Sequence, residues 1–442
     1  MSGHPRLAKN NEDLVLRNFV DNYKSKKSNE KNTLTHLFSK YQIDLDLENF
    51  IESSLDISFQ KVSNDTYLKI FDTNIVNTDL KPDNFDTLTS EIDLNIENEK
   101  FALRAGLTAY EDLSKQNSDR YQYVLPYYDF SRSFFSNNNF ASFDFISQGD
   151  NVLKDTNSLR SRMINNLSIK SYDYYSETGL KNNINYYLKN TINVGKNHSE
   201  YNSSPQIKFK NILELVSSFP LISSSENYTD YLNPKASLRI NPSKMKNYKN
   251  ENRQINYDNI FDINRLGMTD TLESGQNLTL GIDYKKEKID NINKYFEFKL
   301  GKVLRFKSNE NIPSNSTLNK KNSNYFGKLT NNLNDKIYFN YEFSINHDLD
   351  QIQYNSFGTT ITNNNFKTTF NYIEEDGVIG STNILENVTT FNFDEQNFVT
   401  FRTRQNREID LTEYYDLIYE YKNDCLTAGV KYRKTYYTDR DA

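Results

Sequence analysis

A histidine next to carboxylates is the residue combination in this sequence that comes nearest to acid–base chemistry. It occurs at His347, which is followed by Asp348 and Asp350. A correctly placed imidazole can act as a general base. However, the stretch HDLD (347–350) separates two segments with strand periodicity, where the chain must turn, and Asp is common in turns. We therefore interpret His347 as part of a polar hairpin turn.

Other catalytic and metal-binding patterns are missing from the sequence. The four histidines are far apart, and with a single cysteine they form no visible cluster of metal ligands; they are His4, His36, His198 and His347. Neither a GxSxG motif nor a phosphate-binding glycine loop occurs, and the chain has only 14 glycines. We expect no enzymatic activity, no bound metal and no cofactor.

The single cysteine, Cys425, precedes an alternating segment in the stretch NDCLTAGVKYRK. A lone cysteine is usually a small, buried apolar residue. At the edge of a strand, near a turn and in an oxidising compartment, it could instead form a disulfide with a partner outside this chain. Both interpretations remain open, and Cys425 is the candidate for such a bridge.

The composition is polar but rich in aromatic residues. Only 36% of the 442 residues are hydrophobic, yet there are 32 Tyr and 29 Phe, and disordered chains are typically poor in aromatics. The formal net charge of -6 argues against nucleic acid as a partner. No run of about 18 apolar residues could form a transmembrane helix. The N-terminus lacks the features of a signal peptide, so either the protein is cytosolic or a leader has been removed.

Strict alternation of apolar and polar residues recurs along the chain and predicts β-strands. The stretch KIYFNYEFSIN (336–346) has an apolar or aromatic residue at every odd position from 337 to 345. The same alternation is present at 55–59, 92–96, 101–109, 121–134, 140–147, 278–284 and 296–306, and repeatedly from 351 to 434. Convincing helices are scarce, and the best candidate, residues 11–24, is ambiguous.

Short polar turns alternate with longer polar loops between these segments, which is typical of an up-and-down antiparallel sheet with one tight rim and one elaborate rim. The polar segments 247–259 and 309–324 are interpreted as long exposed loops.

Two architectures can bury alternating strands on one face: a soluble sandwich or barrel, and a membrane barrel with its apolar face outward. Strand after strand carries Lys, Glu, Asp, Asn and Thr on the second face, which a water-filled lumen tolerates better than a packed core does. The pattern favours a large antiparallel transmembrane β-barrel of outer-membrane type. The odd residues of 337–345 then face lipid. Tyrosines near predicted strand ends suit an interfacial girdle, or are ordinary cross-strand pairs; they are Tyr127, Tyr128, Tyr186, Tyr187, Tyr414, Tyr415, Tyr436 and Tyr437.

One region carries a motif. The stretch NIFDINRLGMTDTLESGQNLTLGIDY (259–284) resembles a segment of the LptD (OstA) family of lipopolysaccharide-assembly outer-membrane proteins. The motif residues, which we expect to be structural, are Phe261, Asp262, Asn264, Arg265, Gly267, Asp270, Glu273 and Gly275, with Gly281 in the strand that follows. LGKVLRF (300–306), NSNYFGKL (322–329) and the segment after Cys425 are similar to further family segments, with Asn324 in place of the usual Asp.

The resemblance implies a non-enzymatic translocon in the outer membrane of a Gram-negative bacterium. It would insert lipopolysaccharide into the outer leaflet through a polar lumen and a lateral opening between the first and last strands. The implied partners are lipopolysaccharide, an LptE-like lipoprotein plug, the periplasmic Lpt bridge and outer-membrane lipid. The alternative function is that of a generic porin or transport barrel.

The resemblance also divides the chain. Residues 1–34 are expected to be an N-terminal lead segment, and residues 35–442 are expected to form the outer-membrane β-barrel. The family's N-terminal jellyroll and last strand are expected to be absent from this sequence. A cysteine that pairs with Cys425 would lie in the missing periplasmic part.

Overall fold

The structure, a computed structural model, describes residues 19–20, 33–71, 80–82, 84–135 and 140–436. These residues are mainly antiparallel β-sheet, with helical turns only at α1 (Tyr67–Phe71), η2 (Asn117–Arg120) and η3 (Ser314–Ser316). The prediction of an all-β antiparallel chain is confirmed. In this described part of the chain, no helix combines the length and the apolar character that crossing a membrane requires. Apart from residues 19–20, the candidate helix at 11–24 lies outside the described residues.

The chain divides into two compact units. The first comprises Met1–Lys170 and Tyr187–Lys210, and the second comprises Ser171–Tyr186 and Asn211–Ala442. The predicted division into a lead segment (1–34) and a barrel (35–442) stays a prediction.

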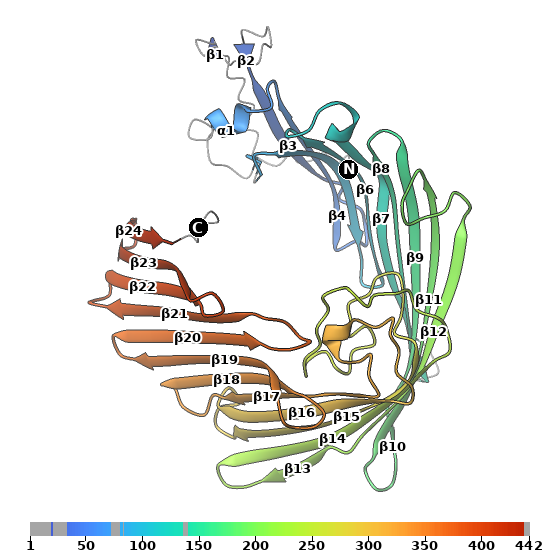
Figure 1. Ribbon diagram of the computed structural model, residues 1–442, viewed down its shortest axis with the longest axis vertical. Coiled ribbons are helices and arrows are strands. Elements are labelled where there is room, and N and C mark those ends of the chain that lie inside the picture. The colour runs from blue at the N-terminus through green and yellow to red at the C-terminus, as the bar shows by residue number, and fades with distance from the viewer. Residues whose placement is uncertain (1–18, 21–32, 72–79, 83, 136–139, 437–442) are drawn as a thin grey trace. The chain divides into compact units, whose positions relative to one another are not determined.

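Strands β3 to β8 of the first unit pair in sequence order, each antiparallel to the next (Figure 1). The strands at the N-terminal end of the chain are β1 (Phe19–Val20), β2 (Thr33–Leu34), β3 (His36–Asp44), β4 (Glu52–Val62), β5 (Thr87–Glu97), β6 (Phe101–Asp112), β7 (Tyr121–Phe135), β8 (Ala141–Lys154) and β9 (Ser158–Ser171). Apolar residues are register partners on one face, as in the pair Ile92 and Leu107. A small core beside this sheet contains the buried Tyr67 and Leu68 of α1.

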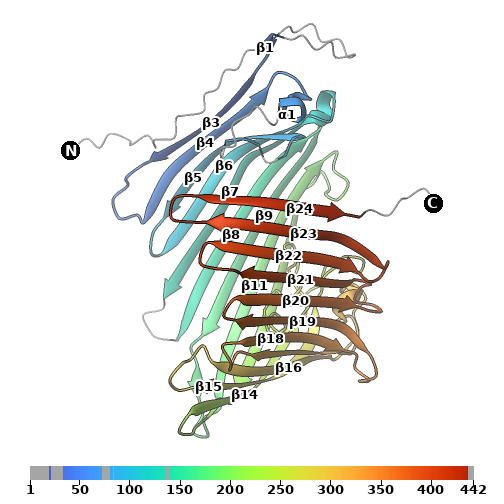
Figure 2. The ribbon, with the colours of Figure 1, turned by 90° about the vertical axis from the view of Figure 1, so that its left-hand side faces the viewer.

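The second unit continues the same antiparallel pattern, with β14 to β24 paired in sequence order. Figure 2 shows β18 to β24 stacked one above the other. Its strands are β10 (Tyr174–Tyr175), β13 (Leu221–Ser224), β14 (Tyr228–Asn241), β15 (Gly275–Lys288), β16 (Tyr295–Arg305), β17 (Asn322–Asn331), β18 (Ile337–Ile345), β19 (Ile352–Asn363), β20 (Phe366–Glu375), β21 (Asn383–Asn392), β22 (Asn397–Asn406), β23 (Leu411–Lys422) and β24 (Thr427–Thr435). Strands β11 (Lys181–Lys196) and β12 (Gln206–Ser218) contribute residues to both units.

The predicted asymmetry between the two rims is present in the second unit. On one rim the connections are short, at 332–336, 364–365, 393–396 and 423–426. On the other rim lie the long connections 242–274 and 306–321. The predicted turn at 347–350 lies between β18 and β19, as expected.

The interpretation of 247–259 and 309–324 as long loops is confirmed except at 322–324, but the expectation that these loops are simply exposed is wrong. Both segments supply buried apolar side chains, including Tyr248, Ile255, Ile312 and Leu318. The last residues of the second segment belong to β17. A polar average composition hides widely spaced apolar residues, and these residues share one small core.

The expected position of several tyrosines at strand ends is also wrong. Tyr127 and Tyr128 lie in the middle of β7, and Tyr186 and Tyr187 lie in the middle of β11. Three other predicted residues are near strand ends, namely Tyr414, Tyr415 and Tyr436, whereas Tyr437 is outside the described residues.

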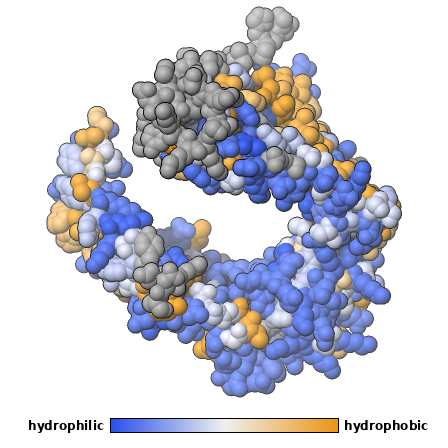
Figure 3. All heavy atoms as spheres, turned by 45° about the horizontal axis from the view of Figure 1, so that its top comes forward, coloured by the Kyte–Doolittle hydropathy of each residue, from blue (hydrophilic) through white to orange (hydrophobic). Residues whose placement is uncertain are grey.

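The sheet from β14 to β18 has two chemically different faces. On one face Thr279 and Val303 are register partners and completely buried, because the long loops lie over them; we call this the loop-covered face. On the opposite face Ile282 pairs with Leu300, and Leu280 is 42% exposed. Hydrophilic residues also cover much of the surface visible in Figure 3.

The stretch 337–345, which is strand β18, follows the same division. Its even residue Ser344 is buried on the loop-covered face, and Glu342 forms an ion pair with Lys328 there. The odd residues lie on the opposite face, where the Phe343 ring lies against Gly327. The predicted separation of odd and even residues is therefore confirmed.

Candidate functional site

Two long loops of the second unit pack together on the loop-covered face. They are residues 242–274, between β14 and β15, and 306–321, between β16 and β17; we call them the loop cluster. Figure 1 shows them gathered on one side of the strands from β14 to β17. Their shared apolar core contains Met245, Tyr248, Ile255, Tyr257, Ile260, Leu266, Met268, Ile312 and Leu318, together with Val303 and Phe326 from the strands beneath. The loop cluster is therefore a folded element with its own core.

A buried carboxylate lies where the loop cluster meets the sheet. Glu273 binds Arg265 in a bidentate ion pair, with Nε to Oε2 at 2.7 Å and Nη2 to Oε1 at 2.8 Å. Arg305, the last residue of β16, forms a second ion pair with Glu273. All three side chains are at most 5% exposed. The pairing offsets the large desolvation cost of burying charge.

Arg265 also binds the loop to the wall of the sheet. Its Nη1 donates to the Ile260 carbonyl at 3.1 Å and to Thr279 Oγ1 at 3.0 Å. Its Nη2 donates to Asn277 Oδ1 at 3.1 Å. One guanidinium thus joins the turn at the centre of the loop to strand β15.

A second buried ion pair lies beside the first. Arg239 of β14 donates from Nε to Glu214 Oε1 of β12 at 2.8 Å. The same guanidinium donates to the backbone carbonyls of Phe261 and Asp262. Arg239 therefore holds the loop through its backbone, whatever side chains the loop carries there.

The loop is attached a third time through aromatic rings. Lys235 Nζ lies 4.3 Å from the centroid of the Phe261 ring and 5.1 Å from that of Tyr257. The ammonium also forms an ion pair with Asp283 at 2.9 Å, and the Tyr257 hydroxyl donates to the same carboxylate. A cation over ring faces, with its own counter-ion, is a stabilising arrangement.

These contacts shift the pKa values of ionisable residues in the loop. Burial alone would raise the pKa of Glu273, but the charges and hydrogen bonds of Arg265 and Arg305 outweigh it and lower the pKa to about 2. Burial and the bond to Asp283 raise the pKa of Tyr257. Burial opposes a low pKa at Asp270, yet the Tyr248 hydroxyl and the Lys246 ammonium lower it. Glu273 and Asp270 are therefore ionised at neutral pH.

The structure brings most of the predicted motif residues into this cluster. Arg265, Glu273 and Phe261 make the contacts described above, and Asp270 binds Lys246 and Tyr248. The side chain of Asp262 is exposed, and only its carbonyl takes part. Asn264 Oδ1 accepts the Met268 backbone N–H at 2.8 Å. Gly267 and Gly275 have positive φ angles of 61° and 94°, which other residues rarely adopt.

The second similar segment joins the same cluster. Gly301 and Arg305 of LGKVLRF lie beneath the loop. Asn324, which replaces the usual Asp, is buried and donates from Nδ2 to Ser344 Oγ at 2.9 Å and to Gln353 Oε1 at 2.8 Å. A carboxylate cannot donate to these acceptors. Asn at position 324 is therefore suited to the acceptors that Ser344 and Gln353 present on the two following strands.

Several residues of the cluster were not anticipated from the sequence. They are Glu214, Lys235, Arg239, Tyr257 and Asp283. The charged residues among them lie in strands that carry many other polar and charged residues, so nothing distinguishes them locally. Burial of Tyr257 could have been predicted, because it is one of several aromatic or aliphatic residues spaced along an otherwise polar loop.

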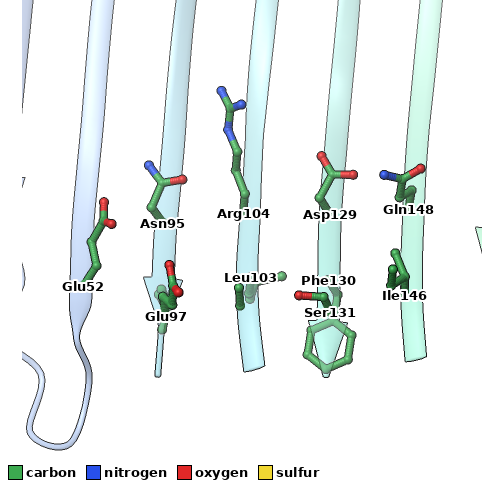
Figure 4. A pocket seen from close by; sticks show the side chains of 12 residues that line it. Glu52, Asn95, Glu97, Leu103, Arg104, Asp129, Phe130, Ser131, Ile146 and Gln148 are labelled. Carbon is green, nitrogen blue, oxygen red and sulfur yellow. The ribbon is translucent and has the colours of Figure 1, made fainter. Parts of the chain in front are cut away.

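A separate hollow lies on the sheet of the first unit. Its volume is about 410 Å³, and Figure 4 shows polar side chains from five neighbouring strands along it. Arg104 Nε donates to Asp93 at 2.8 Å, and the Tyr127 hydroxyl donates to the same carboxylate at 2.7 Å. Asp129 and Gln148 line the hollow beside Arg104. Apolar side chains such as Leu103 and Ile146 also line the hollow, and no buried, unpartnered side chain among the described residues points into it.

The remaining chemical candidates are isolated. His347 Nε2 lies 3.3 Å from Asp348 in the exposed turn between β18 and β19. Cys425 is a free, exposed thiol in the turn between β23 and β24. Among the residues that the structure describes, no group of three or more His, Cys, Asp or Glu side chains could hold a metal ion.

Comparison with known proteins gives one family match. The model of a family described as LptD, LPS transport system D, matches residues 39–404. No curated protein matches the chain. Among solved structures, a mutant of the ferric enterobactin receptor (PfeA) of Pseudomonas aeruginosa is similar at 8% sequence identity and a TM-score of 0.35. The alignment covers 78% of this chain and 65% of the receptor chain, so this chain spans less than two thirds of the receptor's length.

Proposed function

The chain belongs to the LptD family, whose role is in lipopolysaccharide transport at the outer membrane, and we propose that it moves lipopolysaccharide through a polar lumen and a lateral opening between its first and last strands. The predicted fold class, a large antiparallel transmembrane β-barrel of outer-membrane type, is confirmed by this membership together with the antiparallel sheet. In this proposal the chain is a transport component without enzymatic activity.

One observation carries the proposal: the two faces of the β14–β18 sheet differ in polarity. The loop-covered face holds the ion pairs of Glu273, Arg265 and Lys328, whereas the opposite face presents residues such as Leu280 and Phe343. The first face is assigned to the lumen and the second to lipid. Lipopolysaccharide has charged sugars that hydrocarbon excludes and acyl chains that water excludes, so a polar wall with a side exit accommodates both halves.

The partners follow from the same proposal. Lipopolysaccharide is the transported lipid, delivered by a periplasmic Lpt bridge and released among outer-membrane lipids of a Gram-negative cell. An LptE-like lipoprotein would occupy the lumen beside the loop cluster. A disulfide from the exposed Cys425 to a periplasmic partner belongs to this proposal as well. The motif residues from Phe261 to Gly275 are assigned structural roles in holding the loop cluster.

Depletion of the protein in its host tests the function. Lipopolysaccharide at the surface of intact cells is measured with a fluorescent polymyxin, and lipopolysaccharide in the inner-membrane fraction is measured after gradient separation. The expected result is a loss at the surface with accumulation in the inner membrane. Unchanged surface lipopolysaccharide would overturn the proposal. Swelling of liposomes that contain the purified protein, in isotonic small sugars, would then favour a generic porin.

A further inference from the structure

Two glycines on neighbouring strands lie directly beneath the aromatic rings of the 242–274 loop. Gly281 of β15 and Gly301 of β16 are register partners on the loop-covered face. A Cβ added at Gly281 would lie 2.7 Å from Phe261 Cζ and 2.8 Å from Phe261 Cε2. A Cβ added at Gly301 would lie 3.1 Å from Tyr257 Cε2. We call this patch of bare backbone the glycine seat.

The rings above the glycine seat are held from other directions. The Tyr257 hydroxyl donates to Asp283, and Lys235 lies against both rings while pairing with the same carboxylate. The carbonyl of Phe261 accepts from Arg239. Neither ring can retreat from an added methyl group without breaking one of these contacts. A side chain at Gly281 therefore has to push the Phe261 ring away from Lys235 or displace the loop that carries the ring.

This close approach does not extend to every glycine on that face. Gly358 of β19 is the register partner of Asn340, which also lies on the loop-covered face. A Cβ added at Gly358 would lie 3.4 Å from its nearest neighbour, Asn371 Oδ1, which is ordinary contact. Gly358 is therefore a matched control.

We propose that Gly281 and Gly301 are positioning residues that set how closely the 242–274 loop lies against the sheet, and with it the width left for a lipid to pass. The effect on passage rests on the proposed function, whereas the effect on loop position does not. In this proposal the 242–274 loop does not move during transport. It is held on the sheet by the fit of its aromatic rings over the two glycines and by its ion pairs.

The position of the loop is tested by thiol labelling. Ile260 of the loop is completely buried, so Ile260→Cys, in a protein whose Cys425 is replaced by Ser, reports whether the loop stays on the sheet. Adding Gly281→Ala should speed maleimide labelling of the folded fraction roughly tenfold, because overpacking opens a packed segment locally. Gly358→Ala should leave the labelling rate unchanged. Equal rates for the Gly281 variant and its parent would overturn the proposal.

A second substitution makes the test specific to the ring. Phe261→Leu removes the Cζ and Cε2 atoms that the new methyl group of Gly281→Ala would meet, so combining the two substitutions should restore slow labelling. Fast labelling in this double variant would overturn the proposal. Where Ile260→Cys prevents folding, the rate of tryptic cleavage after the exposed Lys249 replaces the labelling rate.

The effect on passage is measured separately, as delivery of lipopolysaccharide to the surface of cells that express each variant. Gly281→Ala should slow delivery, and adding Phe261→Leu should restore it. Altered labelling with normal delivery would overturn the assigned effect on passage. Failure of the proposed function itself would be seen in the depletion experiment and would leave the labelling result intact.

Discussion

Glu273 of the 242–274 loop and Arg305 of strand β16 form an ion pair in which both side chains are almost completely buried. Arg265 completes the pair on the loop side, so a single carboxylate joins two segments of chain. A buried charge that loses one partner is left uncompensated, which costs much more than the pair contributes. The loop cluster is therefore sensitive to any change at Glu273.

Replacing Glu273 by Gln should destabilise the loop cluster by about 3–5 kcal/mol, because two buried guanidinium groups lose their carboxylate. The measurement is the urea midpoint of the heat-modifiable gel shift of the purified protein. Glu310→Gln, an exposed change of the same kind in the neighbouring loop, should have almost no effect. Equal midpoints for the two variants would contradict a structural role for Glu273.

The stability of the loop cluster should decrease in acid. The pKa of Glu273 is lowered from its ordinary 4.5 to about 2 in the folded protein. The stabilisation is therefore fully present above pH 4.5 and is lost as the pH falls through about 2, with a total of about 3 kcal/mol. Urea midpoints measured across this range should fall for the wild type. A Glu273→Gln variant whose midpoints fall equally steeply would show that other groups are responsible.

The face assignment of β18 predicts different effects at neighbouring positions. Phe343→Lys should destabilise the folded protein in lipid vesicles by about 2–4 kcal/mol, because the charge would enter the hydrocarbon region. Asn340→Lys, on the loop-covered face with Lys328 and Glu342, should change the stability by less than about 1 kcal/mol. Comparable losses at both positions would contradict the assignment.

The exposed thiol of Cys425 should form a bond with a periplasmic partner in cells. Non-reducing electrophoresis of the membrane fraction should show a species of lower mobility that disappears on reduction. The Cys425→Ser variant should lack this species, because the chain has no other cysteine. Identical mobility of wild type and variant would instead support a free cysteine.

Strand positions were predictable from the sequence because alternation is a local property. FKTTFNYIEE was expected as a strand and forms β20, and KIYFNYEFSIN was expected to divide its odd and even residues between two faces, as it does. The loop cluster was not predictable in the same way. Its core depends on Tyr248, Ile255 and Leu318 meeting across more than sixty residues of sequence, and no local pattern encodes that meeting.

The contacts of the motif residues were likewise only partly predictable from the sequence. Their order identified the region from Phe261 to Gly275, but the residues that hold this region come from separate strands. Arg239 binds the loop through backbone carbonyls, which leave no trace in the loop sequence. Gly281 and Gly301 are meaningful only once the register places them side by side beneath two rings.

The spacing of the Glu273 contacts leads us to expect an order of assembly in this region. Arg265 is eight residues away along the chain, whereas Arg305 is thirty-two residues away and arrives only when β16 joins the sheet. Short-range closure is fast, and the distant contact waits for the strand. Before β16 joins the sheet, the apolar side chains of the 242–274 segment cannot be buried against it. If β16 is added slowly, an intermediate with exposed apolar residues would be open to proteolysis and to aggregation.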